Sequence, residues 1–178
     1  MKRDFRVIDW YTDVTGYMRL STLLRAMQDV AGQDSENLGF GKDKVFNVGR
    51  RWVISRIAGK IKHMPKCDEM IQIVTWAEKN KLFFYPRFTA VTKNGETCLE
   101  CDTIWAIIDA ETRKPLLPKD TGVIIDEAPE LEKTMKIESK VIVLPTTKSL
   151  ERKVLFTDLD VNNHMNNTVY VDWAYDLL

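Results

Sequence analysis

A stripe of apolar residues at helical spacing is the first pattern along the chain. Between residues 20 and 38, Leu, Met, Val and Ala recur every three or four positions, and glycines follow at 39 and 41. This is the spacing of an amphipathic α-helix, and glycine is the usual residue just beyond a helix end. The pattern predicts a helix of about 18 residues. A strand-like stretch at 5–10 and a turn at 12–16 precede it.

The middle of the chain has the composition of β-strands. Four segments are rich in Ile, Val, Thr, Phe and Trp, namely residues 52–64, 70–78, 82–92 and 97–109. Asn94-Gly95 is the strongest short signal for a hairpin turn, and Asn80-Lys81 marks a second turn. One long helix followed by strands joined by hairpins predicts an antiparallel α+β domain, in which the sheet curls around the helix.

A stretch of mixed charge with three prolines follows. Residues 114–138 have the composition of a linker, with a short helix expected at 129–135. Strand character returns at 140–144 and 153–157.

The final segment repeats the start of the chain. When Asp13 is placed over Asp160, 147 residues later, a Val and a Met also coincide, and a strand-like stretch precedes and a helical pattern follows in both copies. The second copy reaches Leu178 within its helix. An isolated amphipathic helix is marginal in water, so we expect the strands that cover it to lie outside this sequence or to come from elsewhere.

The densest cluster of polar side chains lies in the second copy. Asp160, Asn162 and His164 are spaced so that, in an extended segment, they point to one face. A calcium loop would need Gly and Glu at its sixth and twelfth positions, where Asn163 and Val169 stand. Two interpretations remain: a turn held by its own side chains, or a catalytic site with His164 or Asp160 as base and Asn162 as a polarising amide.

Composition excludes several classes of protein. Hydrophobic residues make up 44% of the 178 residues, and 26 basic residues balance 26 acidic ones, which favours neither a membrane protein nor a nucleic-acid-binding protein. The sequence has no apolar run of transmembrane length and no signal-peptide pattern at its start, so a cytoplasmic location is expected.

The cysteines raise the question of a zinc site. Cys98 and Cys101, with His63 and Cys67, supply four possible zinc ligands on paper. Residues i and i+3 of a strand face opposite sides, so the pair at 98 and 101 is expected to be reduced and packed, with no metal bound.

The segment Asp160-x-Asn162-x-His164, followed by Met-Asn-Asn and by a Tyr and a Trp further on, resembles the catalytic segment of the acyl-acyl carrier protein (acyl-ACP) thioesterases. Further matches to this family are Trp52-Val-Ile-Ser-Arg56, Thr75-Trp76, Ile104-Trp105 and Thr112-Arg-Lys-Pro115. The resemblance implies two hot-dog domains, each a long helix wrapped by a curled antiparallel sheet. Residues 1–118 would form the first domain with the acyl pocket, 119–139 a linker, and 140–178 the start of the catalytic domain.

The resemblance also implies an activity. It is hydrolysis of fatty acyl-ACP in fatty acid biosynthesis, with Asp160, Asn162 and His164 as catalytic residues and no cofactor or metal. The partner would be an acyl carrier protein bearing an acyl-phosphopantetheine, with no nucleic acid and no membrane span; a homodimer is left open. An acyl-CoA thioesterase and a non-catalytic acyl-binding protein are the alternatives.

Two sets of residues are expected to serve these partners. An acyl tunnel beside the first helix would be lined by Leu24, Met27, Trp52 and Trp76. Because acyl carrier protein is acidic, docking would use basic residues, either Arg50, Arg51, Arg56 and Lys60 or Lys79, Lys81 and Arg87. Ordinary core packing and solvated strand faces are the plainer interpretations of these residues.

Overall fold

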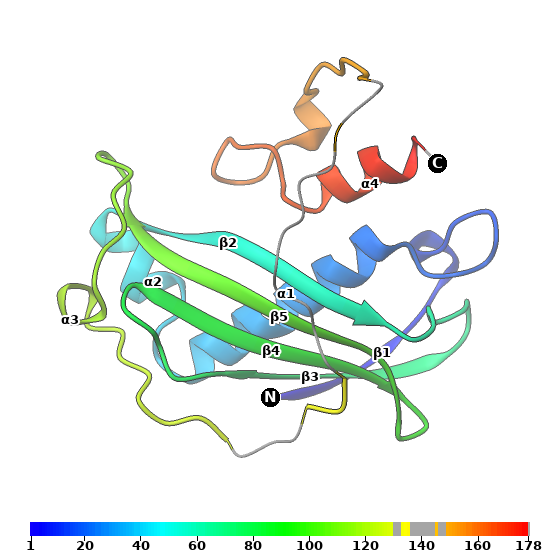
Figure 1. The fold of residues 1–178 in the computed structure, drawn as a ribbon, viewed down its shortest axis with the longest axis horizontal. Helices are drawn as coiled ribbons and strands as arrows, with labels where there is room; N and C mark the ends of the chain where they lie inside the picture. The colour runs from blue at the N-terminus through cyan, green and yellow to red at the C-terminus, as the bar shows by residue number, and fades with distance from the viewer. Residues whose placement is uncertain (130–132, 136–144, 146–148, 178) are drawn as a thin grey trace.

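A five-stranded antiparallel sheet curls around one long helix in the computed structural model, which describes residues 1–129, 133–135, 145 and 149–177 (Figure 1). The helix α1 spans Leu20–Asn37, as its apolar spacing predicts. The strands, in the spatial order β1-β3-β4-β5-β2, are β1 (Lys2–Arg6), β2 (Arg50–Ile61), β3 (Met70–Ala77), β4 (Phe84–Lys93) and β5 (Glu96–Asp109). The α+β hot-dog arrangement is therefore confirmed for the first copy.

Several short helices complete the described chain. They are α2 (Lys42–Val45), α3 (Pro118–Thr121) and α4 (Val169–Tyr175), with 3-10 helices η1 (Asp9–Tyr11), η2 (Phe46–Val48) and η3 (Phe156–Asp158). Within the described residues, no helix combines the length and apolar character needed to cross a membrane.

The core lies between α1 and the concave face of the sheet. Leu23 and Val30 of α1 are buried against Ile73, Val91 and Leu99, which come from three strands. Burying such side chains stabilises a domain by about 1.5–3 kcal/mol each. This packing explains why the helix adopts its position despite having no side-chain cap at its N-terminus.

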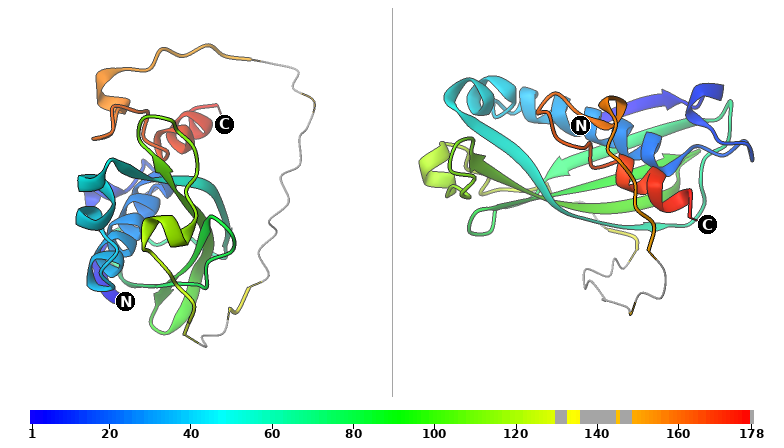
Figure 2. Two further views of the ribbon diagram at one scale, coloured as in Figure 1. Left: turned by 90° about the vertical axis from the view of Figure 1, so that its left-hand side faces the viewer. Right: turned by 90° about the horizontal axis from the view of Figure 1, so that it is seen from above.

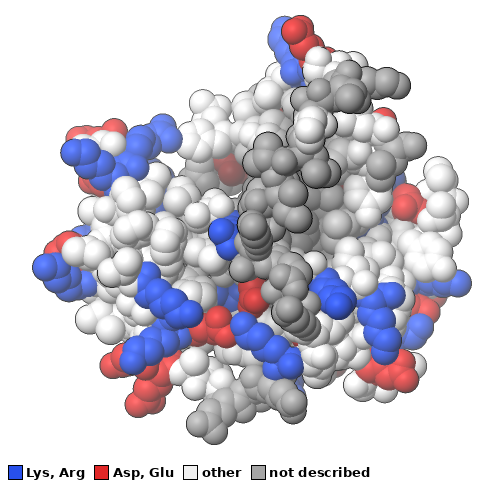
Figure 3. Space-filling model, in the orientation of Figure 1, with Lys and Arg blue, Asp and Glu red and all other residues white. Residues whose placement is uncertain are grey.

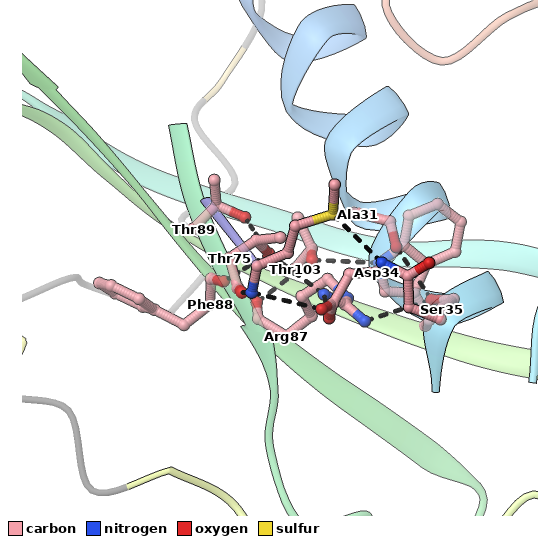
Figure 4. Close-up of polar contacts among 11 residues, drawn as sticks. Ala31, Asp34, Ser35, Thr75, Arg87, Phe88, Thr89 and Thr103 are labelled. Carbon is pink, nitrogen blue, oxygen red and sulfur yellow. Dashed lines mark hydrogen bonds and ion pairs between the residues drawn. The ribbon is translucent and has the colours of Figure 1, made fainter. Parts of the chain in front are cut away.

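A buried ion pair joins α1 to β4 (Figure 4). Nη1 of Arg87 lies 2.6 Å from Oδ2 of Asp34 and donates to the hydroxyl of Thr75 at 3.2 Å. Its Nη2 donates to the hydroxyl of Ser35, also at 3.2 Å. Burial lowers the pKa of Arg87, and the Asp34 carboxylate opposes that change. Arg87 is 5% exposed, so its assignment to a docking surface is wrong.

Boundaries differ from the predicted ones at the start of the chain and in one turn. The first strand is Lys2–Arg6 rather than 5–10, because residues 9–11 form η1. Asn94 and Gly95 both have positive φ, 50° and 84°, which confirms the predicted hairpin turn. The other hairpin turns at Leu82, with φ of 54°, and not at Asn80-Lys81.

The last part of the chain contains no strand among its described residues. The strand predicted at 153–157 is absent, because no described strand lies beside this segment to accept its backbone hydrogen bonds. The strand predicted at 140–144 lies outside the described residues, as does most of the helix predicted at 129–135.

Three described residues of the linker are bound to the outer face of the sheet. The carboxylate of Glu100, itself 1% exposed, accepts the backbone N–H of Thr134 at 2.8 Å and of Met135 at 2.7 Å. Nζ of Lys133 lies 2.9 Å from a carboxylate oxygen of Glu78 and 2.7 Å from one of Asp102. These bonds hold residues 133–135 against the side of the sheet opposite α1.

The internal repeat is visible in the backbone. A 3-10 helix, η1 or η3, precedes each copy's loop, and an isolated antiparallel bridge closes that loop. The bridges join Thr12 to Met18 and Leu159 to Met165, so they correspond at the same offset of 147 residues. The second copy's α4 lies against α1 (Figure 2).

Candidate active site

The loop that carries the Asp-Asn-His motif is a tight turn held by its first residue. The backbone N–H of Asp160 donates to the carbonyl of His164 at 2.8 Å. Oδ1 of Asp160 accepts the backbone N–H groups of Asn162 at 2.8 Å and His164 at 3.3 Å. The expectation of an extended segment is therefore wrong. Asp160 has the structural role of a turn aspartate, while no hydrogen bond from the described residues reaches its Oδ2.

The equivalent loop of the first copy has the same backbone but different chemistry. Oδ1 of Asp13 accepts the backbone N–H of Thr15 at 2.8 Å, and the Thr15 hydroxyl together with this backbone bond lowers the pKa of Asp13. Thr15 and Tyr17 stand where the second copy has Asn162 and His164. The turn is thus common to both copies, and the amide and imidazole are specific to the second.

His164 contacts an arginine that sequence reasoning did not select as a site residue. Its Nε2 lies 3.3 Å from Nη1 of Arg113, which belongs to the turn after β5. The carboxylate of Asp109 organises this turn by accepting the backbone N–H of Thr112 at 2.7 Å and its hydroxyl at 2.8 Å. These bonds lower the pKa of Asp109.

A second set of contacts fastens the end of the loop to α1. The amides of Gln28 and Asn167 bond each other in both directions, at 2.9 Å and 3.3 Å. Nε of Arg25 donates to the hydroxyl of the buried Thr168 at 2.7 Å, and its Nη2 lies 3.5 Å from the carboxylate of Asp172. Since α1 belongs to the first copy, these bonds connect the two copies.

A cavity of about 480 Å³ lies between α1 and the sheet. Trp52, Tyr85 and Trp105 line it with aromatic rings, and Arg87 contributes a polar part of the wall. Gln28 lines the cavity and also bonds the motif loop. One residue of α1 therefore contacts both the cavity and the motif loop.

The structure places the four expected tunnel residues in different surroundings. Trp52 lines the cavity, whereas Leu24 and Met27 belong to the core cluster under α1. Trp76 was wrongly assigned: Ala77 lines the cavity, so its neighbour points to the opposite face of the sheet. There the Trp76 ring packs on Phe88, with centroids 4.6 Å apart.

Besides the buried Arg87, two of the basic residues expected to dock a partner are engaged within the fold. The guanidinium of Arg50 donates to the carbonyls of Asp120 and Thr121 at 2.8 Å and 2.9 Å, and that of Arg51 stacks over the ring of Phe46. Lysine and arginine are interspersed with acidic side chains on the face seen in Figure 3. The remaining basic positions stay predictions.

The cysteine pair of β5 is buried. Cys98 and Cys101 are at most 1% exposed, and burial raises the pKa of both thiols, that of Cys101 to about 12. The part of the chain that the structure describes contains no group of three His, Cys, Asp or Glu residues that could hold a metal ion.

The Gln28–Asn167 contact gives a first prediction. Replacing Gln28 with Ala removes two hydrogen bonds, each worth about 0.5–1.5 kcal/mol, so exchange of amide hydrogens in residues 158–168 should rise by roughly 5- to 150-fold. Hydrogen–deuterium exchange with peptide resolution measures this. Gln33→Ala, on the same helix, is the control and should leave the segment unchanged. Equal exchange in both variants would show that the amide pair does not fasten the loop.

Comparison with known proteins agrees with the geometry. The family model described as the acyl-ACP thioesterase N-terminal domain matches residues 1–121, and that of the C-terminal domain matches residues 144–178. One curated relative is the acyl-[acyl-carrier-protein] hydrolase FATB3 of Cuphea viscosissima, which is 21% identical over 97% of this chain and 45% of the relative. Another is the oleoyl-acyl carrier protein thioesterase 2 of Arabidopsis thaliana, which is 22% identical over 98% of this chain and 53% of the relative.

A solved structure is similar over the whole chain. It is an acyl-ACP thioesterase from Bacteroides thetaiotaomicron, 28% identical, with a TM-score of 0.79 over 100% of this chain and 73% of that one. The chain spans about half the length of the curated relatives named above. Because the N-terminal family model alone covers more than half of the sequence, the chain belongs to the acyl-ACP thioesterase family.

Proposed function

We propose that this protein hydrolyses the thioester of a fatty acyl group carried by acyl carrier protein and releases the free fatty acid. The observation that carries the proposal is the position of the motif loop. The segment with Asp160, Asn162 and His164 is bonded to α1 through Gln28, which also lines the cavity. An acyl chain in that cavity would present its thioester toward the loop.

The three side chains supply the chemistry that the reaction needs. Water and a thioester give a carboxylic acid and a thiol, so one proton must move from the water to the leaving sulfur. Oδ2 of Asp160 is the available base or nucleophile, because Oδ1 is occupied by the turn. Asn162 and His164 provide polar groups for the carbonyl oxygen or the moving proton. Thiolate is a good leaving group, so the reaction needs no metal.

The carrier is the finer part of the proposal. Both curated relatives named above are acyl carrier protein hydrolases, and this supports acyl-ACP over acyl-CoA. The cytoplasmic location and the homodimer stay predictions, since those plant relatives are named as chloroplastic. A role in fatty acid biosynthesis belongs to the same proposal.

The test is hydrolysis of matched acyl-ACP and acyl-CoA substrates, followed by release of thiol and free fatty acid. We expect turnover of acyl-ACP and a loss of at least about 10²-fold in His164→Ala. Tyr17→Ala, at the equivalent position of the first copy, is the matched control and should retain the rate. Preference for acyl-CoA would favour a CoA thioesterase. Acyl binding without turnover, unchanged in His164→Ala, would indicate a binding protein.

A further inference from the structure

Arg113 occupies a backbone conformation that disfavours its own side chain. Its φ is 61°, in the left-handed region where glycine is the residue without strain. The turn is closed by two backbone bonds of 3.0 Å between Asp109 and the pair Arg113 and Lys114. A strained position that carries a long charged side chain is a reason to ask what that side chain contacts.

The side chain of Arg113 extends from the first copy to the motif of the second. Its Nη1 lies 3.3 Å from Nε2 of His164, 51 residues away in the sequence. A guanidinium has five N–H donors and no acceptor, so in this pair Arg113 donates. Nε2 of His164 must then present its lone pair, and the proton of the neutral ring must lie on Nδ1.

We propose that Arg113 is a positioning residue that holds His164 as the neutral tautomer protonated at Nδ1. His164 would then donate a hydrogen bond to the substrate carbonyl and not act as the base, a role that rests on the thioesterase function proposed above. A neutral imidazole can act in this way as a hydrogen-bond donor to a carbonyl. The base is then Oδ2 of Asp160, which receives no hydrogen bond from the residues that the structure describes.

The other charged groups around the pair are compatible with this assignment. In the motif loop, Oδ1 of Asp160 bonds the backbone N–H of His164 and not its ring. In the turn after β5, Oδ1 of Asp109 accepts the backbone N–H groups of Glu111 and Thr112. Neither of these two carboxylate contacts competes with Arg113 for the imidazole.

The experiment is nitrogen-15 NMR of the histidine rings at pH ~9, where histidine side chains are neutral. The sequence has two histidines, so His63→Gln assigns the signals of His164. We expect the proton on Nδ1 in the wild type, and on Nε2, as in free histidine, in Arg113→Gly. Glycine suits the left-handed backbone, so this variant should fold. Lys114→Ala, in the same turn, is the control and should keep the Nδ1 proton.

Turnover separates positioning from substrate binding. Arg113→Gly should lower kcat on the order of 10-fold with KM unchanged, less than the 10²–10³-fold typical of losing a donor itself. A higher KM with an unchanged tautomer would mean that Arg113 binds the phosphate of the carrier's prosthetic group, and would overturn the proposal. Absence of hydrolysis in the wild type would refute the thioesterase function alone, because the tautomer is read without substrate.

Discussion

Replacing Arg87 with Met should lower the free energy of unfolding by about 3–5 kcal/mol, the usual cost of removing one partner of a buried ion pair. Asp34 is 8% exposed, so its carboxylate would remain in the interior without the cation that faces it. The amino group of Met1, 3.3 Å from its other oxygen, is about one-fifth exposed and offsets part of the lost charge. Thr75 and Ser35 would also lose a donor.

Urea unfolding followed by circular dichroism measures this effect. The matched variant is the double replacement Arg87→Met with Asp34→Leu, which removes both charges and should recover most of the loss. A single variant that loses less than about 1 kcal/mol would show that the pair behaves like an exposed one. Because Arg87 also lines the cavity, the same pair supports the wall that an acyl chain would meet.

The fold was largely predictable because its elements are regular over many residues. The apolar stripe of α1 repeats through five turns, and each strand after it has the composition of a half-buried sheet. Asn94-Gly95 specifies its own turn chemistry, since both residues tolerate positive φ. Such signals depend only on residues that are close in the sequence, so they can be recognised without knowing the tertiary contacts.

Side-chain direction within strands was less predictable. Strict alternation from Trp52 would place Ile54 and Arg56 on its face, but the register of β2 against β5 shifts between Ile54 and Arg56. A bulge there moves the following residues to the opposite face, so Ile57 joins the core instead. Trp76 was misplaced because a large aromatic ring can also be buried on the outer face of this sheet, where it packs on Phe88.

The candidate site was predictable in its motif and not in its supports. Asp160, Asn162 and His164 lie within five residues, so a local pattern reveals them. Arg113 and Gln28 reach the loop across 51 and 139 residues of sequence, and only the packing of the two copies brings them there. The left-handed φ of Arg113 could likewise not be predicted from the sequence, since arginine is not typical of such a backbone conformation.

Replacing Asp160 with Asn should lower the turnover of acyl-ACP by at least about 10²-fold while leaving the loop folded. Asparagine retains the side-chain oxygen that accepts the N–H groups of Asn162 and His164, so the turn should persist. The substitution removes the negative charge, and with it the base or nucleophile at Oδ2. Single-turnover assays would place the loss in the chemical step.

The internal repeat supplies the control that separates this loss from a change in the loop. Asp13→Asn makes the same substitution in the same turn of the first copy, where Oδ1 accepts an equivalent N–H bond at 2.8 Å. It should keep the wild-type rate, because Thr15 and Tyr17 provide neither an amide nor an imidazole. Equal losses in both variants would mean that the aspartates act on folding alone, whereas a loss confined to Asp160→Asn would assign the chemistry to the second copy.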